Sequence, residues 1–155
     1  ESLKRELGWA KSTIVLNIDA RHAVKSLLPP KERRAVVLID PPFEEKSEFA
    51  DLVVAIREAM ARFPAGVYLI WYPLKDEAAA DQFVAEVTSL PGIESLDVRL
   101  AVCAPFPGLG LTATGLLVLN PPYLLRNELE IVLPVLRDRM AEGEGSAFHL
   151  RDVVQ

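Results

Sequence analysis

Ala35-Val36-Val37-Leu38-Ile39-Asp40-Pro41-Pro42-Phe43 tells more about the fold of this 155-residue chain than any other segment. The apolar, mostly β-branched residues at its start predict a buried strand. Two prolines end this strand, because a proline offers no N–H to a sheet and fixes its own φ at about −65°. The strand therefore delivers a carboxylate, a rigid turn and an aromatic ring to its C-terminal end.

The residues of this turn suit the methylation of an amino group. The exocyclic amine of adenine is a weak nucleophile, because its lone pair is conjugated with the ring. The carboxylate of Asp40 and the carbonyl of Pro41 can each accept one of its hydrogens, which localises the lone pair and orients it. Pro42 keeps the turn rigid, and Phe43 can stack on a base that has left its helix. The alternative, on these four residues alone, is a proline turn in which Asp40 faces water.

A second acid follows an apolar segment upstream. Residues 13–18 predict a strand, and residues 21–28 predict a helix from the spacing of their apolar side chains. Asp19 and Ala20 then lie at a strand end one βα unit before Asp40, at the edge where doubly wound sheets bind ligands. Rossmann-like methyltransferases hold the adenine of S-adenosyl-L-methionine there, so Asp19 can accept from its amine while the N–H of Ala20 donates to its ring. Asp19 can also act as the N-cap of the helix, and the two roles can coexist.

Helix and strand patterns alternate along the rest of the chain, which predicts one α/β domain over residues 1–155. A helix is expected to begin near Ser47. The further expected elements are, in order, a strand over 66–72, a helix over 75–90, strands over 93–104 and 112–119, a helix over 123–140 and an edge strand over 147–154. The two late strands have no helix between them, so we expect a mostly parallel sheet with an antiparallel strand pair at its end. Pro134 predicts a kink or break in the last helix.

A second tetrapeptide, Asn120-Pro121-Pro122-Tyr123, fits the same consensus, since an amide oxygen can replace the carboxylate as acceptor. The order of the elements favours Asp40, which follows the Asp19 strand by one crossover. Asn120 instead follows an antiparallel pair, and the prolines after it suit the first turn of a helix. We therefore expect Asn120 to cap that helix, while a contribution of this tetrapeptide to the site stays open.

Five segments together resemble the RlmJ-type methyltransferases, which modify the N6 amine of an adenine in large-subunit ribosomal RNA. They are Leu38-Ile39-Asp40-Pro41-Pro42-Phe43-Glu44, Ile70-Trp71-Tyr72-Pro73, Leu111-Thr112-Ala113-Thr114-Gly115, Leu119-Asn120-Pro121-Pro122-Tyr123 and Leu133-Pro134. The resemblance implies a Rossmann-like class I methyltransferase sheet, S-adenosyl-L-methionine as cofactor and 23S ribosomal RNA as partner. The single cysteine is compatible with a cytoplasmic location. The resemblance assigns catalysis to Asp40, Pro41, Pro42 and Phe43, and cofactor binding to Asp19, Ala20 and Asp40. The family's motif usually ends in tyrosine, so Phe43 keeps the ring and lacks the hydroxyl.

The resemblance covers essentially the whole chain, but only the later, C-terminal portion of such an enzyme. The family opens with a basic segment and a strand that ends in a glycine-rich turn, and this chain begins at Glu1 without either. We therefore expect the N-terminal strands of the sheet to be missing. The chain should hold the catalytic and base-binding half of the site and should bind the cofactor poorly on its own.

A loop and several aromatic residues are further candidates for the site. Gly108-Leu109-Gly110 separates the two late strands and fits neither a dinucleotide fingerprint nor a Walker A sequence, so it is interpreted as a connecting loop. The resemblance suggests that this loop folds over the flipped adenine. Trp71, Tyr72, Phe106 and Tyr123 are candidates for stacking on RNA. One of Trp71 and Tyr72 should face the site, because side chains alternate along a strand.

Composition and charge argue against several kinds of site. With 50% hydrophobic residues the chain should fold, and no apolar run reaches the length of a membrane span. The two histidines and the single cysteine, Cys103, show no metal-ligand spacing, so we expect no metal. The net charge of −5 argues against a surface that binds nucleic acid everywhere, although basic residues are in excess before the catalytic strand. We expect a monomer.

Three other functions compete with the methylation of ribosomal RNA. The same motif serves DNA adenine methylation. A strand that ends in an acid also occurs in nucleotide hydrolases, but the chain lacks their glycine-rich loop with Lys-Ser/Thr. The third is a non-catalytic RNA- or protein-binding module, since half of an enzyme can bind without catalysing.

Overall fold

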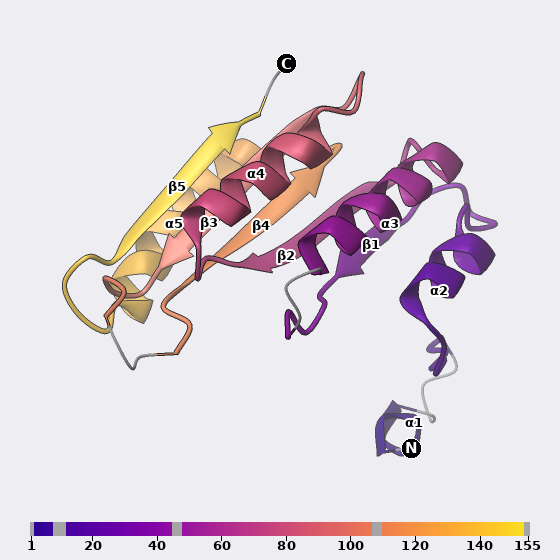
Figure 1. Ribbon diagram of the computed structural model, residues 1–155, viewed down its shortest axis with the longest axis horizontal. Helices are drawn as coiled ribbons and strands as arrows, with labels where there is room; N and C mark the ends of the chain where they lie inside the picture. Colours follow the sequence, from indigo (N-terminus) through magenta and orange to yellow (C-terminus); the bar gives the residue numbers. More distant parts are fainter. Residues whose placement is uncertain (1, 8–11, 45–47, 107–109, 154–155) are drawn as a thin grey trace.

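The computed structural model describes residues 2–7, 12–44, 48–106 and 110–153. Their helices are α1 (Ser2–Leu7), α2 (Ala20–Leu27), α3 (Glu48–Arg62), α4 (Glu77–Thr88) and α5 (Leu125–Met140). Their strands are β1 (Val36–Ile39), β2 (Val67–Pro73), β3 (Ser95–Ala101), β4 (Ala113–Leu119) and β5 (Ala147–Asp152). The strands form one mixed sheet in the order β1-β2-β4-β3-β5, and Figure 1 shows helices on both of its faces.

The sheet is mostly antiparallel, and only β1 and β2 pair in parallel among the described strands. The expectation of a mostly parallel sheet is therefore wrong, whereas the antiparallel pairing of β3 with β4 is confirmed. The reason is the position of β4. Helices α3 and α4 return the chain so that β1, β2 and β3 run in one direction, but β4 turns back from β3 and inserts between β2 and β3. Both neighbours of β4 are then antiparallel to it.

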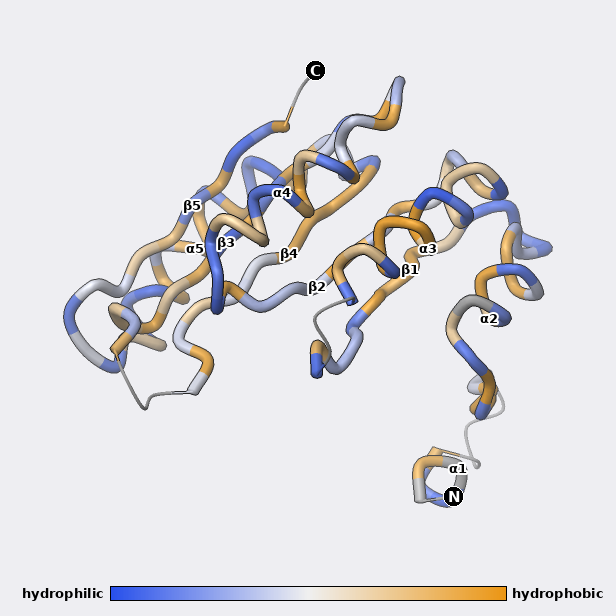
Figure 2. Tube along the Cα trace, in the orientation of Figure 1, coloured by the Kyte–Doolittle hydropathy of each residue, from blue (hydrophilic) through white to orange (hydrophobic). Residues whose placement is uncertain are grey.

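Two hydrophobic layers hold the helices on the sheet. On one face α3 and α4 cover β2, whose Tyr68, Ile70 and Tyr72 are fully buried. On the other face α5 packs through Leu133 against residues of β3 and β4, namely Leu96, Val98 and Val118. Hydrophobic residues run along β1 and the C-terminal half of β4 (Figure 2). The expectation that β1 is a buried strand is wrong for one of its faces, because Val36 and Leu38 are 65% and 67% exposed at the edge of the sheet. The core therefore lies over the centre of the sheet, with β1 and β5 at its edges.

No strand forms over residues 13–18, contrary to the expectation from their apolar pattern. Ile14 is 83% exposed, and Leu16 and Ile18 are also exposed. Because β1 is the edge of the described sheet, no described strand lies beside this segment to pair with its N–H and C=O groups. Figure 1 shows α1, which precedes the segment, lying apart from the sheet. An apolar pattern produces a strand only where a neighbouring strand completes its hydrogen bonds.

Helix α4 begins at Glu77, slightly later than the expected start at residue 75. The side chain of Asp76 accepts a hydrogen bond from the N–H of Ala79 at 3.2 Å, which satisfies one of the free donors of the first turn. The expected start of α3 at Ser47 lies outside the described residues, and the helix is observed from Glu48.

Helix α5 runs through Pro134, so of the expected kink or break the break does not occur. A proline inside a helix removes one backbone hydrogen bond and crowds the preceding turn. Here contacts on both sides of the proline hold the helix to the sheet. Leu133 is buried in the core, and the Arg137 guanidinium lies 5.7 Å from the centroid of the Phe148 ring. Packing therefore outweighs the local preference for a break.

Gly115 lies at the centre of the sheet for a steric reason. It pairs with Tyr72 on one side and with Arg99 on the other. The Tyr72 ring lies so close to Gly115 that a Cβ atom at this position would overlap it. The absence of a side chain is therefore what lets Tyr72 lie flat on β4 beneath α4.

We predict that Gly115→Ala lowers the free energy of unfolding by about 1–3 kcal/mol or more, because the added methyl group must displace a fully buried ring. Urea denaturation followed by circular dichroism measures this change. Gly110→Ala is the matched control, since a Cβ at Gly110 meets nothing within 4 Å. Equal stability of the two variants would contradict the steric role of Gly115.

Candidate active site

The parallel pairing of β1 and β2 brings the ends of both strands to the same edge of the sheet. We call this edge the carboxyl rim, formed by residues 40–43 after β1, residues 74–75 after β2 and Thr112 before β4. The rim is tied together where β2 ends, because the N–H of Leu74 donates to the carbonyl of Ala113 at 3.0 Å. Residues 40–43 and residues 74–75 therefore follow adjacent strands of the sheet.

Asp40 directly follows β1 and its side chain is exposed at the carboxyl rim. Within the described part of the chain, no group donates a hydrogen bond to its carboxylate or forms an ion pair with it. The carbonyl of Pro41 likewise receives no N–H from a described residue. The structure therefore presents an acid and a neighbouring main-chain oxygen as hydrogen-bond acceptors at the end of one strand.

Phe43 is held in the turn by other aromatic rings. Its φ is 51°, a backbone conformation that a non-glycine residue rarely adopts. Its ring centroid lies 5.1 Å from that of Phe49 and 5.8 Å from that of Trp71, both in tilted arrangements. Phe49 continues the contact to Phe83 in the core at 5.0 Å. Ring packing thus stabilises an uncommon backbone at this turn, a feature that is typical of functional sites.

Trp71 and Tyr72 point to opposite faces of β2, as their alternation predicts. Trp71 is half-buried and touches Phe43 at the carboxyl rim. Tyr72 is fully buried under α4, so the expectation that it stacks on RNA is wrong.

Asp19 and Ala20 begin α2, and the capping role of Asp19 is confirmed. Its Oδ1 accepts a hydrogen bond from the N–H of His22 at 3.3 Å. The C-terminal half of α2 lies beside that of α3, because Lys25 Nζ is 3.5 Å from a carboxylate oxygen of Glu58. Figure 1 shows the two helices running in the same sense. Since α3 starts from the carboxyl rim, Asp19 and Ala20 lie at the same end of the molecule as Asp40.

A cavity of about 390 Å³ opens at the carboxyl rim beside the end of β2. We call it the rim cavity, and its lining includes Leu74, Lys75, Pro105, Phe106, Leu111 and Thr112. Phe106 is 58% exposed and Leu111 is 40% exposed. Of the expected loop Gly108-Leu109-Gly110, residues 108 and 109 lie outside the described part. The sequence pointed to this connection but not to Lys75, whose position depends on where β2 ends.

The second tetrapeptide lies at the opposite edge of the sheet. Because β4 runs against β2, Asn120 follows β4 where β2 begins, and Leu119 pairs with Tyr68. The side-chain amide of Asn120 donates to the carbonyls of Pro64 (2.8 Å) and Gly66 (2.7 Å), and its φ is 52°. Asn120 therefore clamps the turn before β2, at the edge of the sheet opposite to Asp40.

Asn120 is also not the cap of α5, contrary to expectation. The helix begins at Leu125, and Leu124 occupies the N-cap position without a side-chain hydrogen bond. The two prolines therefore precede the helix, and Pro122 accepts a hydrogen bond through its carbonyl from the N–H of Leu125 at 2.9 Å. Tyr123 is 95% exposed at this opposite edge, so it cannot stack on a base held at Asp40.

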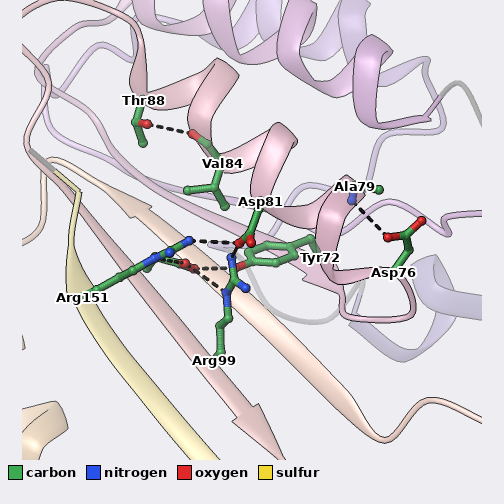
Figure 3. A network of polar contacts seen from close by, with 9 residues as sticks. Tyr72, Asp76, Ala79, Asp81, Val84, Thr88, Arg99 and Arg151 are labelled. Carbon is green, nitrogen blue, oxygen red and sulfur yellow. Dashed lines mark hydrogen bonds and ion pairs between the residues drawn. The ribbon is translucent and has the colours of Figure 1, made fainter. Parts of the chain in front are cut away.

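A cluster of charges, which the sequence analysis missed, lies between α4 and the strands β3 and β5 (Figure 3). Asp97 is fully buried and accepts hydrogen bonds from the Tyr72 hydroxyl, from Arg99 Nε (3.0 Å) and from Arg151 Nε (2.9 Å). Asp81 on α4 joins the same arginines at 2.6 Å and 3.2 Å. The acids and the arginines balance each other, so the cluster locks α4 onto the sheet. The signal in the sequence is an Asp and an Arg two residues apart in a strand.

Burial and the hydrogen bond to Asp97 raise the pKa of Tyr72 well above its ordinary value of 10.0. The unfolded chain therefore loses this proton at a lower pH than the folded chain does. Above a pH of about 10 the unfolded state binds fewer protons, so the free energy of unfolding falls as the pH rises. Burial also raises the pKa of Tyr68 to about 12, which adds to the same fall.

We predict that, between pH 9 and pH 11, the free energy of unfolding falls less for Tyr72→Phe than for the wild type. This is roughly the range in which tyrosine titrates in the unfolded chain. Urea titrations at several pH values measure the slope. Tyr123→Phe is the control, because Tyr123 is 95% exposed. An identical slope for Tyr72→Phe and wild type would show that folding does not raise the pKa of Tyr72.

No group of three or more His, Cys, Asp or Glu side chains that could hold a metal ion occurs among the described residues. No helix in the described ranges is long and apolar enough to cross a membrane. Cys103 is buried, as its apolar surroundings predict.

Comparisons with known proteins agree on one family. The family model RsmJ, described as "Ribosomal RNA large subunit methyltransferase D, RlmJ", matches residues 1–151. A curated relative from Haemophilus influenzae is 42% identical over 126 residues, which cover 79% of this chain and 44% of the relative. A second, from Escherichia coli K12, is 34% identical over 146 residues, which cover 94% of this chain and 52% of the relative. Both are named "Ribosomal RNA large subunit methyltransferase J".

A solved structure shows the same fold. The crystal structure of a protein from Legionella pneumophila strain Philadelphia 1 superposes with a TM-score of 0.77 and is 31% identical. The match covers 86% of this chain and 49% of that one. The chain thus spans about half the length of the relatives it matches.

Proposed function

The chain belongs to the RsmJ family of ribosomal RNA large subunit methyltransferases, and from this premise we propose that it carries the catalytic and base-binding half of an enzyme that methylates the N6 amine of an adenine in 23S ribosomal RNA. S-adenosyl-L-methionine is the proposed methyl donor. The observation that carries the proposal is the exposed carboxylate of Asp40 at the carboxyl rim, beside the Pro41 carbonyl and the anchored ring of Phe43. Because the chain spans about half of its relatives, the activity is proposed for the enzyme that contains these residues.

Asp40 and Pro41 activate the amine by accepting its hydrogens. The amine of adenine has two N–H groups, and one carboxylate oxygen with one main-chain carbonyl provides two acceptors for them. These hydrogen bonds pull the nitrogen lone pair out of conjugation and aim it in one direction. The prolines fix the carbonyl, because Pro41 and Pro42 have restricted φ. Since Asp40 is exposed, water can take the proton that the nitrogen releases.

Asp19 and Ala20 fit the adenine of S-adenosyl-L-methionine. The cofactor, when bound, supplies an electrophilic methyl group. The N–H of Ala20 belongs to the first turn of α2, where backbone donors have no acceptor within the helix. The carboxylate of Asp19 can accept more than one hydrogen bond, so a cap and a contact to the cofactor's amine are compatible. Asp40 is proposed to contact both the cofactor and the target base.

Phe43 is proposed to stack on the flipped adenine. Its ring is half-buried, with Phe49 and Trp71 behind it. An aromatic face replaces the stacking that a base loses when it leaves its helix. The ring is held by other rings, so little conformational entropy is lost when a base binds.

The fold supports a Rossmann-like class I methyltransferase sheet, since β1, β2 and β3 run in one direction and β4 against them. In this proposal residues 1–155 are the C-terminal portion of one catalytic domain, and the enzyme works in the cytoplasm as a monomer without a metal.

We predict that Asp40→Ala lowers kcat for methyl transfer by about 100-fold or more, because one of the two acceptors is lost. Asn120→Ala should leave kcat within about two-fold, because Asn120 clamps the opposite edge, although its loss costs stability of about 1–3 kcal/mol. Transfer of a radiolabelled methyl group from S-adenosyl-L-methionine to 23S ribosomal RNA measures both variants, below their unfolding temperatures.

Mass spectrometry of the digested RNA identifies the product nucleoside. N6-methyladenosine in RNA, and none in a DNA of the same sequence, supports the proposal. Full activity of Asp40→Ala, or a methyl group on another atom, would overturn it.

A further inference from the structure

We propose that the rim cavity binds the nucleotide next to the target adenine in the same RNA strand, with its base on Phe106 and its phosphate at Lys75. This inference rests on the proposed function and extends it to the recognition of the flanking strand. The cavity is bordered by the chain that leaves β2, and the target site is bordered by the chain that leaves β1. Adjacent strands lie about 4.8 Å apart, so the two places are neighbours along the carboxyl rim.

Phe106 provides the surface for the base. The Phe106 ring is 58% exposed beside the cavity, so a base can stack on it. Any of the bases can do so, because each has a π-face. Leu111, which is 40% exposed, extends the apolar surface next to it. Together the two side chains offer an apolar surface that a base can cover.

Lys75 provides the charge for the phosphate. Its side chain is exposed and is the charged group among the described residues that line the cavity. The neighbouring acid Asp76 is turned to its own helix, because its carboxylate accepts from the N–H of Ala79. A cation beside an aromatic face is the combination that binds a single nucleotide of an unpaired strand.

The walls of the cavity are fixed to the sheet by backbone hydrogen bonds. The N–H of Leu74 donates to Ala113 O (3.0 Å), and that of Val102 donates to Thr112 O (2.9 Å). Ala104, just before the aromatic wall, donates to Glu144 O at 2.8 Å. A site whose backbone is already ordered loses little entropy on binding, which favours a weakly held ligand such as one nucleotide.

The test compares variants of the rim cavity with matched variants at the opposite edge. Phe106→Ala removes the ring, and Lys75→Gln removes the charge. Phe106→Tyr is the conservative variant that keeps an aromatic ring. Tyr123→Ala and Lys31→Gln are the controls, because Tyr123 is exposed and Lys31 lines a different cavity away from the rim. The enzyme is titrated with a single-stranded RNA oligonucleotide that contains the target adenine, at several salt concentrations, and kcat and KM are measured on the same RNA.

Phe106→Ala should weaken binding and raise KM by about ten-fold, with kcat at saturating RNA unchanged, and Phe106→Tyr should bind like the wild type. Lys75→Gln should reduce the slope of log K against log salt by about 0.7, the value for one phosphate contact on a single strand. The two controls should bind like the wild type.

Binding within two-fold of the wild type for both rim variants would overturn the inference and would point to a protein segment as the occupant. The proposed function would then still stand if Asp40→Ala loses kcat without losing RNA affinity. Conversely, an Asp40→Ala enzyme that keeps its kcat would overturn the proposed function, whatever the cavity variants do.

Discussion

The parallel pairing of β1 with β2 is the constraint on which the rest of the structure depends. It places Asp40 and Lys75 at one edge of the sheet, and the helix α3 that joins the strands covers the core. Strand β4 runs the other way and carries Asn120 to the opposite edge, where its amide closes the turn before β2. Two tetrapeptides of nearly the same chemistry thus lie at opposite edges of the sheet, because the strands before them run in opposite directions.

A chain of aromatic rings joins the carboxyl rim to the interior. Phe43 contacts Phe49, Phe49 contacts Phe83, and Phe83 contacts Tyr72 at 5.6 Å. Tyr72 ends this chain at the buried carboxylate of Asp97, which two arginines neutralise. A buried charge cluster of this kind is worth little as net stability, but breaking it leaves an unpaired charge, so it defines one packing of α4 on the sheet. The turn at the rim therefore has a rigid support, which a site that orients a small amine requires.

The sequence predicts the parts of the fold that depend on local chemistry. The strand before Asp40, the cap at Asp19, the late antiparallel pair and the edge strand β5 all follow from periodicity, prolines and capping residues. It fails where a distant partner decides. Residues 13–18 have a strand pattern without a neighbouring described strand, and α5 continues through Pro134 because packing holds both sides of it. Local sequence patterns do not predict features that depend on contacts between distant residues. These are the insertion of β4, the clamp at Asn120 and the cluster around Asp97. At the carboxyl rim, the sequence predicts the strand and turn that carry Asp40, but not the cavity beside Lys75.

The central claim is that a carboxylate and a main-chain carbonyl receive the two hydrogens of an adenine amine. A crystal structure of the enzyme with S-adenosylhomocysteine and an RNA oligonucleotide that contains the target adenine tests it most directly. The account predicts that the N6 nitrogen lies within about 3.2 Å of a carboxylate oxygen of Asp40 and of the carbonyl oxygen of Pro41. An adenine whose amine instead faces solvent, or lies at the edge that holds Asn120, would contradict it.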